Sequence, residues 1–264
     1  MSGSVDPFAR HRSEVPDVLA HGSPEDVKRL YVRLSEDLEA AFGEDPAQAP
    51  RLSYGETAEV VADAVPPHAR LLLDVGCGPD PGVGSLLAAR EGSTVVALDI
   101  GLGTVRLARS KAALAGIPLL GVVADAERLP FRDGCFDAVV CDDTIEHLPD
   151  DARGVAELAR VVRPAGRVVI ATPNRWSAQV LVRRARDLRR RRRLPASAYF
   201  AATSHLREYT WPQLARLARG AGLRVVERRS VDWPGSGRRA AVSAATRRAP
   251  GRMLSRMLVL VLER

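Results

Sequence analysis

Residues 71–78 read Leu-Leu-Leu-Asp-Val-Gly-Cys-Gly, and this stretch decides the fold class. Its apolar first half predicts a buried strand, and two glycines follow where the chain has to turn toward a helix. A glycine has no Cβ, so its backbone can approach a ligand closely, and the free amide groups at the start of the next helix can donate to that ligand. The stretch therefore predicts a ligand-binding turn between a strand and a helix.

The residues after this turn argue against a dinucleotide as the ligand. The sequence continues Pro-Asp-Pro-Gly-Val-Gly over residues 79–84, so the GxGxxG spacing of dinucleotide enzymes is absent. Asp74 also stands two residues before the first glycine, where its charge would repel a pyrophosphate. An acid at this position suits a ligand that carries a cationic amino group.

Apolar strands and helices alternate outward from this turn. Seven strands are expected, at residues 71–75, 94–98, 119–124, 136–141, 167–171, 223–227 and 257–262. Helices are expected between them, at residues 83–90, 104–115, 152–162 and 211–219. This alternation predicts an α/β fold, a Rossmann-like, doubly wound and mostly parallel seven-stranded sheet with helices on both faces.

The residues before the first strand predict a helical cap. Residues 1–22 are polar and lack a repeat, so we expect a loose tail there. Ser23 and Pro24 suit an N-cap and a first helical position, and apolar residues then recur at helical spacing as far as Leu38. A second helix is expected over residues 56–65.

Three strands end in acidic residues, which share one edge of a parallel sheet. Asp99 ends the second strand, where a carboxylate can accept hydrogen bonds from two ribose hydroxyls. Asp125 follows the third strand and Asp142 follows the fourth. Each acid alone also fits a turn or a helix cap, so only their joint spacing favours a nucleoside site.

These motifs resemble those of class I S-adenosylmethionine (SAM)-dependent methyltransferases. Residues 74–78 resemble the first motif of the family, residues 124–131 its adenine-binding turn, and residues 163–168 the turn before its fifth strand. The resemblance covers about residues 52–174 and 205–229, and it is closest to quinone and secondary-metabolite O-methyltransferases. It implies SAM as the cofactor, held by Asp74, Gly76, Cys77, Gly78, Gly82, Asp99, Ile100, Asp125, Ala126 and Asp142. Gly82 is expected to replace the third glycine of the motif, because Pro79 and Asp80 appear as an insertion.

Two histidines are candidate general bases for a hydroxyl acceptor. His147 follows the fourth strand and His205 precedes the sixth, and an imidazole can remove a hydroxyl proton near neutral pH. The alternative for each is a structural role in its loop. The resemblance to the family allows a metal at the position of Glu146, but the sequence shows no cluster of further ligands around it, so no metal is expected.

One basic segment carries the whole net charge of the chain. Residues 183–193 hold eight Arg and one Asp, a net charge of +7 that equals the formal charge of all 264 residues. We divide the chain into residues 1–50, a tail and helical cap, and residues 51–264, the methyltransferase domain, with residues 174–209 as an Arg-rich, lid-like insertion. The segment is interpreted as a solvated face or as a contact with an anionic acceptor or a membrane surface.

Nucleic acid is disfavoured as a partner, since no aromatic residues interrupt the Arg run. The expected function is methyl transfer to a small molecule, most simply to a hydroxyl of a metabolite, sugar or lipid-linked intermediate. An RNA or protein methyltransferase and a SAM-binding protein without catalysis stay open as alternatives. Three cysteines, a polar N-terminus and the lack of a long apolar run favour a cytoplasmic protein, and the sequence sets no oligomeric state.

Overall fold

The computed structural model describes residues 14–48, 55–80, 82–178, 180–181, 205–232 and 254–264. The Arg-rich run and most of the expected lid therefore lie outside the described residues. In the part described, no helix is long and apolar enough to cross a membrane. All three cysteines are free thiols.

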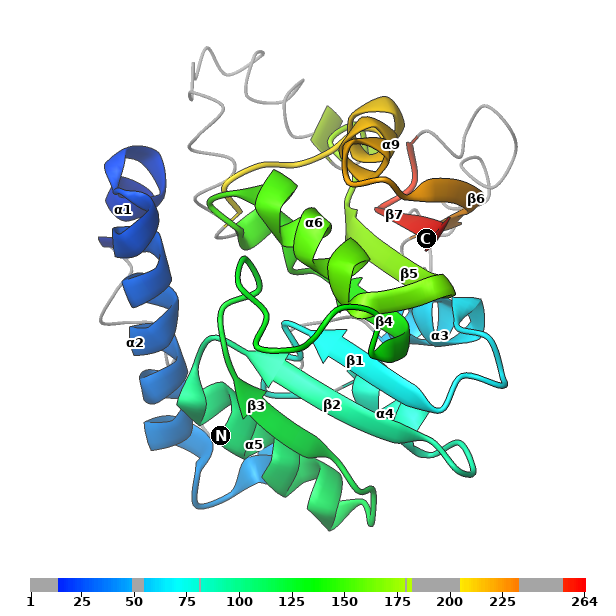
Figure 1. Cartoon of the computed structure of the whole chain (residues 1–264). Helices are drawn as coiled ribbons and strands as arrows, with labels where there is room; N and C mark the ends of the chain where they lie inside the picture. Colours follow the sequence, from blue (N-terminus) through cyan, green and yellow to red (C-terminus); the bar gives the residue numbers. More distant parts are fainter. Residues whose placement is uncertain (1–13, 49–54, 81, 179, 182–204, 233–253) are drawn as a thin grey trace, which may run out of the picture.

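A seven-stranded sheet forms the centre of the molecule, as the sequence predicts (Figure 1). Its strands lie in the order β3-β2-β1-β4-β5-β7-β6. All neighbouring pairs from β3 to β5 are parallel, and β7 runs antiparallel to both of its neighbours. The strands are β1 (Leu71–Val75), β2 (Thr94–Asp99), β3 (Leu120–Val123), β4 (Phe136–Asp142), β5 (Val162–Pro173), β6 (Arg224–Val231) and β7 (Met257–Glu263).

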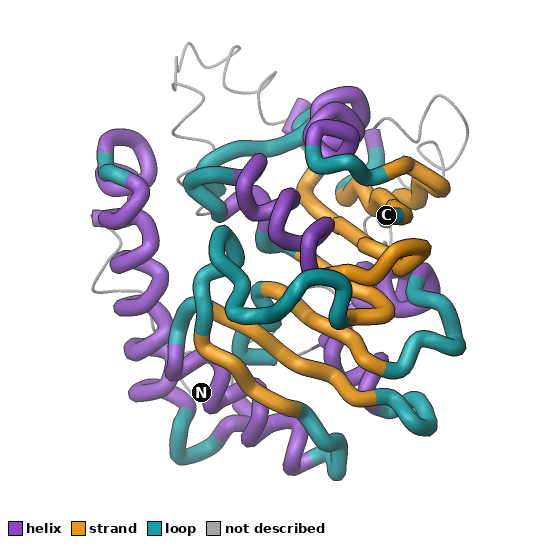
Figure 2. The backbone as a smooth tube through the Cα atoms, viewed as in Figure 1, coloured by secondary structure: helices purple, strands orange, loops and turns teal. Residues whose placement is uncertain are grey.

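Helices cover both faces of this sheet (Figure 2). Helices α3 (Gly55–Ala64), α4 (Gly82–Ala88) and α5 (Leu102–Leu114) pack on one face, and α6 (Asp151–Val161) and α9 (Trp211–Gly220) on the other. Successive side chains of a strand point to opposite faces. Leu72 therefore packs in the core on the side of α3, α4 and α5, and Leu73 in the core on the side of α6 and α9. Burial on both faces explains why the strands read as continuous apolar runs.

The N-terminal cap contains a helix that the sequence analysis did not expect. Helix α1 (Glu14–His21) lies within the stretch expected to be a loose tail, so that expectation is wrong for these residues. Val15 is buried in a small cluster with Leu30 and Leu34 of helix α2 (Pro24–Phe42). Eight residues are too few for a stable helix in isolation, and contact with α2 supplies the missing stability.

Helix α2 stands beside the edge of the sheet where the ligand is expected. The arrowheads of β1 and β2 point toward the side of the molecule on which α2 stands (Figure 1). Its start is fixed by the expected cap, because the Ser23 side chain accepts from the Asp26 amide and Asp26 accepts in return from the Ser23 amide. The helix thus lies where it can contribute side chains to a site.

Candidate functional site

The glycine turn after β1 has the conformation that the sequence predicts. Gly76 and Gly78 have φ angles of 72° and 64°, in the left-handed region that favours glycine. A Cβ on Gly76 would lie 2.2 Å from Thr144 Oγ1, so the loop after β4 packs directly against this residue. A Cβ on Gly78 would meet nothing within 4 Å. Gly78 therefore presents its backbone to open space, whereas Gly76 is needed for packing.

Asp74 lies beneath the turn and faces helix α4. Its side chain is buried and accepts a hydrogen bond from the Gly84 amide. Burial raises the pKa of Asp74 to about 7. A Cβ on Gly84 would lie 2.7 Å from Asp74 Oδ2, so Gly84 is the glycine that close packing requires. Gly82, which is expected to replace the third glycine of the motif, begins α4 and donates to the Asp80 carbonyl.

Asp99 ends β2, beside Gly78. Its carboxylate accepts from the Gly101 amide at 3.0 Å and from the Gly78 amide at 3.3 Å. Each carboxylate oxygen has a second lone pair, so both can also accept from ribose hydroxyls. Burial raises the pKa of Asp99 to about 6, although these amides favour the charged form. Ile100 follows and is half-buried.

The turn after β3 is tied to helix α2 by a lysine that the sequence analysis missed. Lys28 Nζ lies 2.8 Å from Asp125 Oδ2 and 2.6 Å from Glu127 Oε2. The other oxygen of Asp125 accepts from the Glu127 amide at 2.8 Å, and Ala126 between them is buried. Lys28 is one of only two lysines in the chain, which was the available signal.

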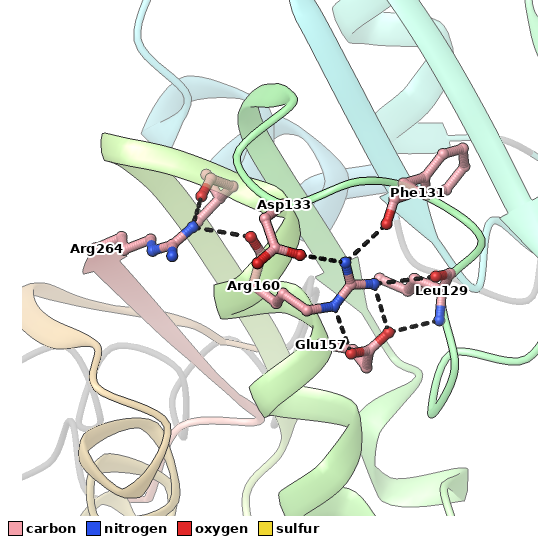
Figure 3. Close-up of polar contacts among 7 residues, drawn as sticks. Leu129, Phe131, Asp133, Glu157, Arg160 and Arg264 are labelled. Carbon is pink, nitrogen blue, oxygen red and sulfur yellow. Dashed lines mark hydrogen bonds and ion pairs between the residues drawn. The ribbon is translucent and has the colours of Figure 1, made fainter.

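Arg160 of α6 holds the loop that continues from this turn (Figure 3). Its guanidinium donates five hydrogen bonds, to both oxygens of Glu157, to the Leu129 and Phe131 carbonyls and to Asp133. Glu157 accepts in addition from the Leu129 amide at 2.7 Å. We call this group the Arg160 clamp. It fixes residues 129–133 to α6 and so supports the turn that carries Asp125.

Asp142 ends β4 with a carboxyl group that lacks hydrogen bonds. Neither of its buried oxygens accepts from any of the described residues. Burial raises the pKa of Asp142 well above its usual range, and the charges of Asp143 and Asp74 raise it further. Asp143 has a φ of 48°, a strained value for a residue with a side chain. Unsatisfied buried groups next to a strained residue are typical of a ligand site.

The two candidate histidines meet beside Asp142. His147 lies in the short helix η3 (Ile145–His147). The backbone at the end of the insertion returns to η3 through a hydrogen bond from the Leu206 amide to the Glu146 carbonyl. The ring centroids of His147 and His205 are 5.0 Å apart. Burial and the nearby His147 lower the pKa of His205 to about 3, so His205 is neutral at pH 7.

Glu146 lies next to the two histidines. Its side chain is buried, accepts from Thr172 Oγ1 at 2.8 Å and lies 3.9 Å from His205 Nε2. Burial and the Asp143 charge raise the pKa of Glu146 well above its usual range. One ligand atom each of Glu146, His147 and His205 lie within 4.8 Å of one another. The sequence analysis saw no cluster around Glu146, because His205 joins it only in the folded chain.

The geometry agrees with comparisons to known proteins. The family model described as a methyltransferase domain matches residues 73–170. A ubiquinone biosynthesis O-methyltransferase of Xanthomonas axonopodis pv. citri is 31% identical over 169 residues, which are 63% of this chain and 68% of the relative. The enzyme of that name from Paracidovorax citrulli is 39% identical over 118 residues, 42% of this chain and 46% of the relative.

A solved structure shows the same fold. Magnesium protoporphyrin IX methyltransferase from Synechocystis, solved with bound SAH, is 16% identical with a TM-score of 0.57 and covers 80% of this chain and 83% of its own. The chain spans about half the length of several curated relatives that it matches. Motifs, fold and relatives agree, and the chain belongs to the family of class I SAM-dependent methyltransferases.

Proposed function

We propose that the chain transfers a methyl group from SAM to a hydroxyl oxygen of a small molecule. The observation that carries this proposal is the row of acids at one sheet edge, where Asp99 and Asp125 follow neighbouring strands and Asp142 has no hydrogen bond from the described residues. Gly78, where an added Cβ would meet open space, lies at the same edge next to Asp99.

Each of these acids would contribute to SAM binding. Asp99 would accept from the ribose hydroxyls, and Asp125 with the Ala126 backbone would bind the adenine. Asp142, rather than Asp74, would receive the cationic end of the cofactor, because Asp74 is buried against α4 whereas both oxygens of Asp142 lack a hydrogen bond from the described residues. Gly76, Cys77 and Gly78 supply the turn, and Asp74 holds that turn on α4.

We assign His147 as the general base. SAM supplies a methyl group on a positively charged sulfur. As the acceptor oxygen forms its bond to the methyl carbon, the carbon–sulfur bond breaks and the oxygen's proton passes to a ring nitrogen of His147. Most of the rate enhancement comes from holding the two reactants in line. His205 is the second candidate, with a lower basicity because of its burial.

The names of the relatives favour one class of acceptor for this proposal. Their names refer to ubiquinone biosynthesis, so a hydroxylated quinone-type or other secondary metabolite is the first expectation. Sugars and lipid-linked intermediates fit the same chemistry. Residues 174–209 would select the acceptor. Their arginines would attract an anionic acceptor or make peripheral contact with a membrane surface. The protein would act in the cytoplasm.

Calorimetry and labelled-methyl transfer test the proposal together. SAM and its demethylated product should bind and NAD should not, and label from SAM should enter a small-molecule fraction of a cell extract. Label in RNA or protein fractions would support the alternative that uses the Arg-rich run. Binding without transfer to any fraction would indicate a SAM-binding protein without catalysis.

The cluster of Glu146, His147 and His205 calls for a metal test. One oxygen and two nitrogens at these distances are a donor set that zinc accepts. The proposal uses His147 as a base without a metal, so dialysis against EDTA should leave the transfer rate unchanged. Loss of the rate with EDTA, and recovery with zinc or magnesium but not with calcium, would replace the base assignment with a metal-assisted one.

A further inference from the structure

Helix α2 brings a tyrosine to the candidate base. Tyr31 Oη lies 2.8 Å from His147 Nδ1, a hydrogen bond that joins residues 116 positions apart. The two rings meet edge to face, with centroids 5.4 Å apart and planes at 84°. In the sequence, Tyr31 is recognisable only as one of the apolar positions at helical spacing in the cap helix.

Tethers on both sides of Tyr31 fix its place. One turn before it, Lys28 is paired with Asp125 and Glu127. One turn after it, the buried Ser35 accepts from the Thr104 amide at 2.8 Å. A Cβ on Gly101 or Gly103 would come within 2.3 Å of Ser35, so α2 and α5 fit tightly here. The contact of Tyr31 with His147 is therefore held by the fold on both sides.

We infer that Tyr31 is a positioning residue for His147. This inference rests on the proposed function, in which His147 takes the acceptor's proton. With Nδ1 occupied by Tyr31, the working nitrogen of His147 is Nε2. For Nε2 to have a free lone pair, Nδ1 has to carry the ring proton, and the Tyr31 oxygen accepts from it. The same bond becomes charge-assisted once His147 is protonated, so Tyr31 favours the transition state.

The surroundings keep Tyr31 in the form that this role needs. Burial raises the pKa of Tyr31, and the charge of Glu146 raises it further. The phenol therefore stays protonated and cannot itself compete for the acceptor's proton. The ring of His205 also packs edge to face against His147. The N-terminal cap thus contributes a side chain to the chemistry, in addition to covering the cofactor edge.

The test compares Tyr31→Phe with Ser35→Ala. Each variant removes one hydroxyl from α2, but only the first touches His147. Tyr31→Phe should keep the Kd for SAM within about twofold. The amount of the acceptor-containing extract fraction that gives half of the maximal rate should also stay within about twofold. Its maximal rate of label transfer should fall by about tenfold to a hundredfold, because the base is no longer held in place. Ser35→Ala keeps the Cβ and the backbone carbonyl that pack on Gly101 and Gly103, so α2 should stay in place and the maximal rate should stay within about twofold.

Nitrogen-15 NMR of the imidazole rings gives a readout that does not depend on turnover. The chain has five histidines, so His147 can be assigned with a His147→Gln variant. We expect a protonated Nδ1 and an unprotonated Nε2 in the wild type and in Ser35→Ala, and a mixture of tautomers in Tyr31→Phe. A proton on Nε2 in the wild type, or an unchanged rate in Tyr31→Phe, would overturn the inference. Failure of every fraction to take label would refute the proposed function instead, and the NMR result would still decide the Tyr31–His147 bond.

Discussion

Two polar regions of the molecule use their hydrogen-bonding groups in opposite ways. In the Arg160 clamp all five guanidinium hydrogens are donated to protein acceptors. At the ends of β4 and the insertion, both oxygens of Asp142 and the Nδ1 of His205 lack hydrogen bonds within the described part of the chain. A satisfied network stabilises the fold, whereas unsatisfied buried groups lower stability and mark the place of a ligand.

The largest effect is expected from breaking the clamp. Arg160→Met should lower the free energy of unfolding by about 2–4 kcal/mol, because it leaves Glu157 and two loop carbonyls without their donor. Urea denaturation measures this change. Asp133→Asn is the matched control and should cost less than about 0.5 kcal/mol, since the Asp133 side chain is 72% exposed. Equal costs for the two variants would show that the network does not act as a clamp.

Asp99 combines features of both regions. Its carboxylate accepts from two backbone amides, and it has further lone pairs for a ligand. Asp99→Ala should weaken SAM binding by about 1.5–3 kcal/mol through the loss of charge-assisted bonds to the ribose. Calorimetry on the folded variant measures this loss. An unchanged SAM affinity would remove Asp99 from the cofactor site.

Asp142 should separate ligand binding from stability. Asp142→Asn should weaken SAM binding by about 1–2 kcal/mol while leaving the free energy of unfolding of the ligand-free protein unchanged, because neither Asp142 oxygen has a hydrogen bond from the described residues to lose.

The matched control for Asp142 is Asp137, at the other end of the same strand. Asp137 accepts from the Arg70 and Leu71 amides, which hold its pKa below the usual range despite burial. Asp137→Asn should lower stability and keep SAM affinity. The reverse pattern in the two variants would contradict the comparison.

The smallest effect concerns pH. Asp99 has to be ionised to accept strong hydrogen bonds, and its pKa is raised to about 6. SAM affinity should therefore fall as the carboxyl takes up a proton, by about fourfold between pH 7.5 and pH 5.5. In Asp99→Asn the affinity should be low at both values, and the fourfold fall that Asp99 contributes should be absent. Tighter binding of SAM by the wild type at pH 5.5 would show that the charged form is not the binding form.

The strands and most of the helices could be predicted because their signals are local. The expected strand at residues 71–75 matches β1, and the Ser23 cap and Pro24 start of α2 are as predicted. Helix α1 was missed because its stability comes from contact between Val15 and α2 rather than from its own eight residues. Gly84 was missed because its close neighbour, the Asp74 carboxylate, precedes it by ten residues across the turn.

The sequence by itself determined the fold class and the cofactor edge. Each of these depends on a strand, a turn and an acid that are adjacent along the chain, so spacing alone locates Gly76, Gly78 and Asp99. Only the tertiary structure decided which side chains meet at the proposed acceptor end. Lys28 and Tyr31 come from the cap, and His205 comes from the end of the insertion, about 60 residues after Glu146. Contacts at such separations are set by how helices and strands pack, and no local pattern in the chain records them.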